Sequence, residues 1–105
     1  MSGRPKTPEA YAGLVDQAVF ELQDILEAAR YDNEEIEVYL AYVDTLLREL
    51  RELRAGMADG SYRFGRTDLP FMRIVKQHTE KDLPCIRLFY DINRTHREGL
   101  DIDGD

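Results

Sequence analysis

The chain has few residues that could cross-link it, and no run that could anchor it in a membrane. Its 105 residues include a single cysteine, Cys85, which excludes an internal disulfide and predicts a reducing compartment, the cytoplasm by default. No apolar run approaches the roughly 20 residues that a membrane-spanning helix needs, so we expect no membrane partner. With 43% hydrophobic and 33% charged residues, four prolines and no Ser- or Gln-rich tract, the composition is that of one folded domain.

Basic residues are also in the minority, and the net charge is −7. The charge is uneven: −7 over residues 1–60, +4 over residues 61–97 and −4 over residues 98–105. An acidic protein is repelled by nucleic acid and by anionic membranes, so we expect no nucleic-acid partner. The basic middle segment is the one place where that expectation could fail locally.

The first long element is an amphipathic helix, predicted over residues 8–30. Thr7 is a suitable N-cap, and Pro8 fits the first helical position, where its missing N–H is not needed. Apolar residues then recur every three or four positions, which places them on one face of a helix. These are Val15, Ala18, Leu22, Ile25 and Ala29, widened by Val19 and Leu26.

A second amphipathic helix is predicted over residues 33–58, ending at Gly60. Its apolar residues form two rows. Ile36, Leu40, Val43, Leu47 and Leu50 make the first row at heptad spacing, and Leu46 and Leu53 make the second. Because only about three residues separate the two helices, they should fold back on each other as an antiparallel hairpin.

A phrase of nine residues occurs twice in the third quarter, as TDLPFMRIV from Thr67 and KDLPCIRLF from Lys81. In each copy Asp can cap a helix, with Leu and Pro as the first two helical residues. This interpretation predicts two shorter helices, over about 69–79 and 84–97. Alternating apolar residues in the second copy leave a small β-hairpin at about 70–93 as the alternative.

These elements predict an all-α fold, in which a long antiparallel helical hairpin is packed by two shorter helices. The α+β fold with strands at 70–93 is the alternative. Residues 1–6 are predicted to be a flexible arm, residues 7–97 a single helical domain and residues 98–105 an acidic tail.

The residues suited to enzyme or metal chemistry are few. Cys85, near a predicted helix start, is a candidate thiolate, and His78 and His96 are the candidate bases. With Glu98 they could ligate a metal only if the last two helices cross suitably, and their spacing matches no familiar metal motif. Residues 101–105, DIDGD, resemble the start of an EF-hand loop. Their glycine comes too early, and no Glu follows at the twelfth position. We therefore expect no cofactor, and we expect Cys85 to be a buried structural residue.

One short segment mixes aromatic and cationic residues, as a site for single-stranded nucleic acid or a phosphorylated ligand does. It consists of Tyr62, Arg63, Phe64 and Arg66. The structural alternative is that the two rings pack against the hairpin while the arginines offset the acidic first half.

The leading hypothesis is a non-catalytic cytoplasmic interaction or adaptor protein, which works as a helical homodimer or binds another protein. It depends on the two apolar rows of the second helix, because one hairpin partner and two short helices need not cover both. The predicted partner surface consists of Tyr39, Tyr42, Leu46 and Leu53. An anion or nucleic-acid binding module and a small thiol or metal enzyme remain the alternatives.

Overall fold

The structure, a computed structural model, describes residues 4–32, 36–81 and 83–101, and all of their side chains except those of residues 29–40. It contains four helices: α1 (Pro8–Asp32), α2 (Ile36–Asp59), α3 (Met72–Val75) and α4 (Ile86–Glu98). More than half of the chain is helical, and the described residues contain no strand. The all-α prediction is therefore confirmed, and the described part of 70–93 forms helices and turns where the alternative had strands.

The start of α1 is built as the sequence predicts. The Ala10 N–H donates to Thr7 Oγ1 at 3.0 Å, and the Tyr11 N–H donates to the Thr7 carbonyl at 3.0 Å. Thr7 thus caps a helix whose first residue is Pro8. The helix runs two residues beyond the predicted end at residue 30.

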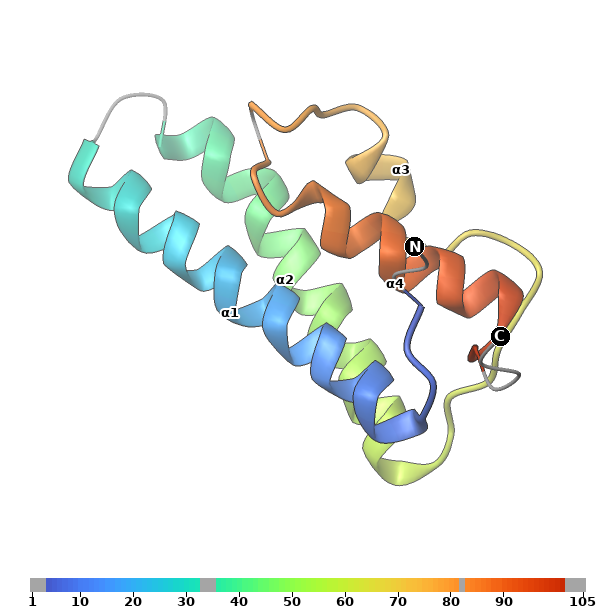
Figure 1. Ribbon diagram of the computed structural model, residues 1–105. Helices are drawn as coiled ribbons and strands as arrows, with labels where there is room; N and C mark the ends of the chain where they lie inside the picture. Colours follow the sequence, from blue (N-terminus) through green and yellow to red (C-terminus); the bar gives the residue numbers. More distant parts are fainter. Residues whose placement is uncertain (1–3, 33–35, 82, 102–105) are drawn as a thin grey trace.

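The helices α1 and α2 lie side by side and run in opposite directions, which is the predicted hairpin (Figure 1). At the far end of α2, Gly60 has φ +82°, the left-handed conformation in which glycine ends helices at little cost. The residues that follow, 61–71, form an extended connector that leads to α3.

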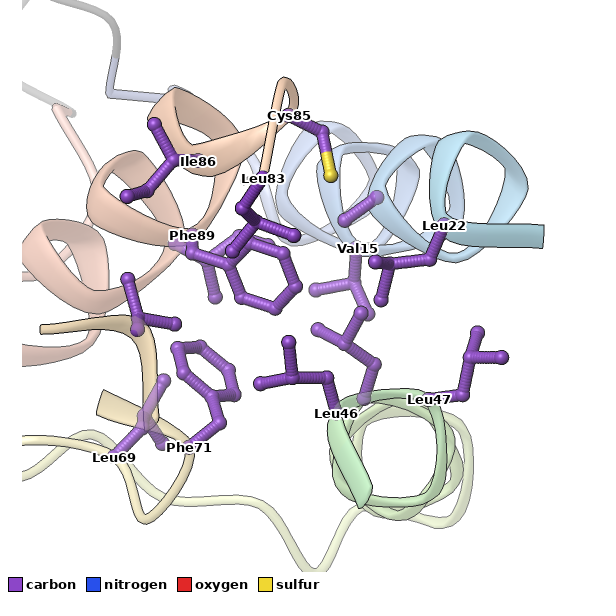
Figure 2. Packing of buried hydrophobic residues seen from close by; sticks show 14 of the residues in the cluster. Val15, Leu22, Leu46, Leu47, Leu69, Phe71, Leu83, Cys85, Ile86 and Phe89 are labelled. Carbon is purple, nitrogen blue, oxygen red and sulfur yellow. The ribbon is translucent and has the colours of Figure 1, made fainter. Parts of the chain in front are cut away.

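The second half of the chain covers one face of the hairpin, where α4 packs on α1 and α3 packs on α4 (Figure 1). One core cluster draws side chains from all four helices. At its centre Phe71 and Phe89 meet edge to face, with ring centroids 5.1 Å apart, next to Leu46 of α2 (Figure 2). The short second-half elements therefore complete the core that the hairpin leaves open.

The repeated phrase starts a turn and not a helix. In both copies the residue three places after Leu donates its N–H to the Leu carbonyl: Met72 to Leu69 at 3.0 Å, and Ile86 to Leu83 at 2.9 Å. Pro occupies the second position of each turn, where its fixed φ is favourable. The predicted helix starts at 69 and 84 are thus too early, and α3 is a single turn where 69–79 was predicted. No Asp side chain caps α3, and Asp82 lies outside the described residues.

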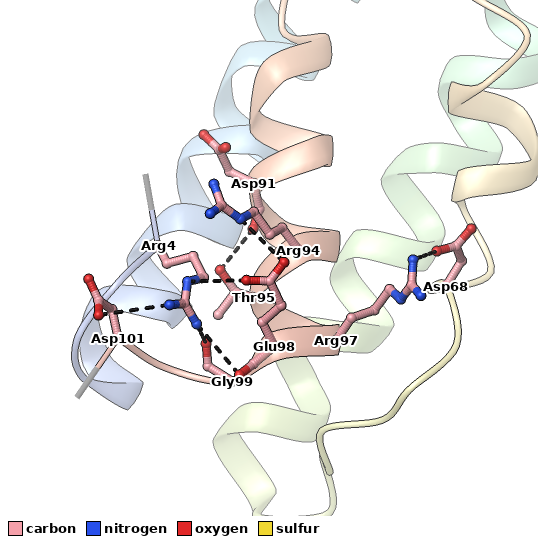
Figure 3. Close-up of polar contacts among 9 residues, drawn as sticks. All are labelled: Arg4, Asp68, Asp91, Arg94, Thr95, Arg97, Glu98, Gly99 and Asp101. Atoms are coloured by element: carbon pink, nitrogen blue, oxygen red, sulfur yellow. Dashed lines mark hydrogen bonds and ion pairs between the residues drawn. The ribbon is translucent and has the colours of Figure 1, made fainter. Parts of the chain in front are cut away.

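Two residues of the predicted flexible arm, Arg4 and Pro5, contact residues 98–101. Arg4 donates to the Gly99 carbonyl at 3.0 Å and lies 3.7 Å from a Glu98 carboxylate oxygen and 3.8 Å from an Asp101 one (Figure 3). The Asp101 N–H donates to the Pro5 carbonyl at 2.9 Å. Arg4 and Pro5 are therefore attached to the start of the predicted acidic tail, whose residues 102–105 lie outside the described residues.

Candidate functional site

A chain of hydrogen bonds joins three distant parts of the sequence where α1 begins and where α2 and α4 end. The Tyr11 hydroxyl donates to the Ile92 carbonyl at 2.9 Å and lies 3.1 Å from the Tyr62 hydroxyl. The Tyr62 hydroxyl in turn lies 2.7 Å from Nδ1 of His96. The chain ties the connector to both α1 and α4.

Counting protons fixes the direction of this chain. Each phenol has one proton, and the Tyr11 proton is used by the Ile92 carbonyl. The Tyr62 hydroxyl therefore donates to the Tyr11 oxygen, and Nδ1–H of His96 donates to the Tyr62 oxygen. All contacts are satisfied when Nδ1 of His96 carries a proton, so the neutral ring is the Nδ1–H tautomer.

The pKa shifts agree with a chain of neutral groups. Burial lowers the pKa of His96, which favours the uncharged imidazole. Burial also raises the pKa values of Tyr11 and Tyr62 above their ordinary value. The other edge of the His96 ring lies against Gly65, where an added Cβ would be 2.9 Å from Nε2. A side chain at position 65 would therefore force the His96 ring to shift, which gives His96 a packing role.

Beside this chain lies a hollow that we call the aromatic groove, about 520 Å³ in volume, between the start of α1, the end of α2 and the connector. Phe64 stands at its edge with 47% of its surface exposed. The Phe64 ring stacks on Tyr11 at 5.9 Å and meets Tyr62 edge to face at 5.3 Å. Ala12, Gly13 and Gly56 also line the groove and contribute no large side chain to it.

A second hollow, the basic groove, lies between α4 and the connector and has a volume of about 810 Å³. It is lined by Arg66, Tyr90, Asp91, Asn93, Arg94, Arg97 and Glu98. Arg94 pairs with Glu98 at 3.5 Å, and Arg97 pairs with Asp68 at 3.3 Å (Figure 3). The Arg66 side chain makes no hydrogen bond or ion pair with the part of the chain that the structure describes.

The predicted anion segment is thus divided between the two grooves. Tyr62 and Phe64 pack with Tyr11 against the hairpin, as the structural alternative proposed. Arg63 donates to the carbonyls of Gly60 and its neighbour Tyr62. Arg66 alone reaches the basic groove, where its neighbours are two arginines of α4.

Asp68, expected as a helix cap, binds side chains instead. It accepts hydrogen bonds from Lys76 at 2.7 Å and from Nδ2 of Asn93 at 3.0 Å, which hold its pKa below the ordinary value. Oδ1 of the buried Asn93 accepts the Leu69 N–H at 2.8 Å. The first copy of the repeated phrase is therefore anchored to α4 by a side chain.

The candidate thiol and bases do not share one site. Burial and the nearby charge of Glu21 raise the pKa of the Cys85 thiol to about 11, so it is a poor nucleophile at neutral pH. His78 stacks on Tyr42, with ring centroids 4.1 Å apart. His96 contacts Tyr62 near the end of α4, whereas Cys85 lies at its start. Across the described ranges no three His, Cys, Asp or Glu residues are grouped so that they could hold a metal ion.

The predicted partner surface is largely used by the chain itself. Leu46 is fully buried in the core, and Leu53 and Tyr42 pack partly against it. The Tyr39 side chain lies outside the described residues. Leu46 is therefore not available to a second chain, whereas Leu53 and Tyr42 keep part of their surface exposed.

Sequence reasoning missed Tyr11, Asn93 and Tyr90. Tyr11 lies four residues before Val15, so extending the apolar row of the first helix by one turn would have included it. Tyr90 precedes Arg94 by the same spacing, which indicates a shared helix face. Asn93 had no signal, because nothing in the sequence near it indicates a buried amide.

No known protein family matches the chain, and comparisons with curated proteins and with solved structures found no similar protein. None of the helices that the structure describes is long and apolar enough to cross a membrane.

Proposed function

We propose that the protein is a non-catalytic interaction module or adaptor, and that its aromatic groove binds a basic, partly apolar segment of another protein. The observation that carries this proposal is the exposed Phe64 ring, held in a fixed orientation by Tyr11 and Tyr62. An exposed apolar side chain that is already ordered loses little conformational entropy when a partner covers it. Large exposed rings beside a hollow are typical of interaction sites.

The charge around the groove favours a basic partner. Its lining includes Glu9, Asp16 and Arg54, and the Asp16 and Arg54 charges offset each other in an ion pair at 2.9 Å. The remaining charge is that of Glu9, within a half of the chain whose net charge is −7. A segment with lysine or arginine beside apolar residues complements this surface. A second copy would bring two acidic halves together, and like charges oppose that contact.

The test uses three labelled amphipathic peptides of equal length, each with leucine on one face and with lysine, glutamine or glutamate on the other. We expect the lysine peptide to bind most tightly by fluorescence anisotropy and the glutamate peptide not to bind. The Phe64→Ser variant should weaken binding, whereas Phe20→Ser should not, because Phe20 is 67% exposed on α1 but does not line the groove. Equal effects of the two substitutions would refute the site.

A second variant separates loss of the site from loss of the fold. Gly13→Leu places a side chain at the groove wall, where an added Cβ meets no atom within 4 Å. The variant should keep its helix content by circular dichroism and should lose the lysine peptide. If it binds the peptide as the unmodified protein does, the groove is not the docking site.

Self-association remains a prediction, tested by light scattering. A mass near 12.2 kDa that does not change with concentration would exclude the homodimer. A doubled mass that persists in Phe64→Ser would place the contact outside the aromatic groove. Leu46→Glu is unsuited to this test, because a charge at a fully buried position would disrupt the fold.

A further inference from the structure

The two walls of the basic groove are held at a fixed spacing. Three hydrogen bonds to backbone atoms of the connector join it to α4: Gly65 N–H to the His96 carbonyl at 3.2 Å, Leu69 N–H to Asn93 at 2.8 Å, and Arg97 Nε to the Arg66 carbonyl at 3.2 Å. The groove is therefore formed before any ligand arrives, as ligand sites usually are.

The arginines of the groove differ in whether another side chain pairs with them. Arg94 and Arg97 lie in the last turns of α4, where the helix dipole stabilises positive charge. Each also has a carboxylate partner. Arg66 is not in a helix and has no partner in the described part of the chain. Its guanidinium is thus available, and arginine binds the oxygens of a phosphate group in a planar, two-point contact.

Tyr90 supplies a flat apolar surface next to these charges. It lies one helical turn before Arg94, lines the same groove and is 45% exposed. An exposed tyrosine ring beside arginine can stack on the planar ring of a ligand. The neighbouring Asp91 carboxylate can accept hydrogen bonds from ligand hydroxyl groups.

We propose that the basic groove binds a small phosphate monoester that carries a planar ring, of the nucleoside monophosphate class. The phosphate contacts Arg66 with Arg94 or Arg97, and the ring stacks on Tyr90. Arg94 and Arg97 each have a carboxylate partner, so the guanidinium left to pair with the phosphate group is that of Arg66. The net charge of −7 repels a long polyanion such as nucleic acid more than it repels a small ligand. The volume of about 810 Å³ lies within the usual range of small-molecule sites.

The experiment is a titration of the labelled protein with adenosine 5′-monophosphate, ribose 5-phosphate and adenosine, followed by NMR chemical shifts. We expect the monophosphate to bind most tightly, ribose 5-phosphate more weakly and adenosine least. Arg66→Gln should weaken monophosphate binding about tenfold, the usual loss for a hydrogen bond to a charged group. Tyr90→Ala should weaken the monophosphate and leave ribose 5-phosphate unchanged. Arg87→Gln, on the same helix but outside the groove, is the matched control and should have no effect.

Several results would overturn the proposal. They are the absence of saturable shifts at millimolar monophosphate, adenosine binding as tightly as the monophosphate, and no loss in Arg66→Gln. A single-stranded oligonucleotide that binds far more tightly than the monophosphate would replace the small-ligand site with a nucleic-acid site. Because these substitutions lie outside the aromatic groove, the lysine-peptide test of the proposed function is unaffected by either outcome.

Discussion

The two copies of the Asp-Leu-Pro phrase begin alike and end differently. Both make the same turn, and in both the same four positions are buried. Those positions hold Leu69, Phe71, Met72 and Val75 in the first copy, and Leu83, Cys85, Ile86 and Phe89 in the second. Yet α3 has four residues and α4 has thirteen. The phrase therefore determines a turn and a burial pattern, and it does not determine the length of the helix that follows.

The residues downstream of each copy account for the difference. After Val75 come Lys76 and Gln77, both exposed, and no buried side chain continues the row. After Phe89 the row continues through Ile92, which is fully buried in the core cluster. A helix in a protein owes most of its stability to the packing of one face, so the helix ends where that face ends.

The largest difference between the copies is expected at their last buried position. Phe89→Ala should lower the free energy of unfolding by about 3–5 kcal/mol, the usual cost of removing a buried ring. Val75→Ala should cost about 1.5 kcal/mol, because it removes two methyl groups at about 0.8 kcal/mol each. Urea denaturation measures both, with the exposed Phe20→Ala as a control that should change stability by no more than about 0.5 kcal/mol. Equal losses at the two positions would contradict the unequal roles of the copies.

A second difference lies in how each turn is anchored. The Leu69 N–H depends on the Asn93 side chain, whereas the Leu83 N–H donates to the Thr79 carbonyl at 2.8 Å. Asn93→Ala should therefore cost about 1–3 kcal/mol, because it leaves a buried N–H without a partner. Hydrogen exchange should accelerate at the Leu69 amide and stay unchanged at the Leu83 amide. Acceleration at both amides would indicate a general loss of structure.

The far end of the longer helix should respond to pH. Because burial lowers the pKa of His96 below its ordinary value of 6.5, the unfolded chain takes up a proton before the folded one does. Stability should be complete above pH 6.5 and fall as the pH drops below it, before carboxylates such as Asp68 begin to contribute. His96→Gln should remove this fall in thermal melting temperature. His78→Gln, the control, should keep it.

The smallest effect is expected at the two prolines, where the copies are alike. Pro70→Ala and Pro84→Ala should each lower the free energy of unfolding by about 0.4–1 kcal/mol, because alanine gives the unfolded chain more freedom. Chemical denaturation of both variants should show similar losses. A much larger loss at one proline would mean that the two turns are not equivalent.

The hairpin was predictable because its signals are local. A cap, a first-turn proline and apolar spacings of three and four residues determine α1 without reference to any other part of the chain. The same signals misplaced the start of α3, because the N-cap preference of Asp competed with a lysine and an amide that only the fold brings near Asp68.

The sequence alone determined the two long helices, the absence of an internal disulfide and the placement of charge, since these depend on near neighbours or on composition. Only the tertiary structure decided which polar side chains meet. Tyr11, Tyr62 and His96 form one hydrogen-bond chain although at least 34 residues separate any two of them. Arg97 received a carboxylate partner and Arg66 did not. Such pairings depend on how helices far apart in the sequence pack together, and no local pattern specifies that.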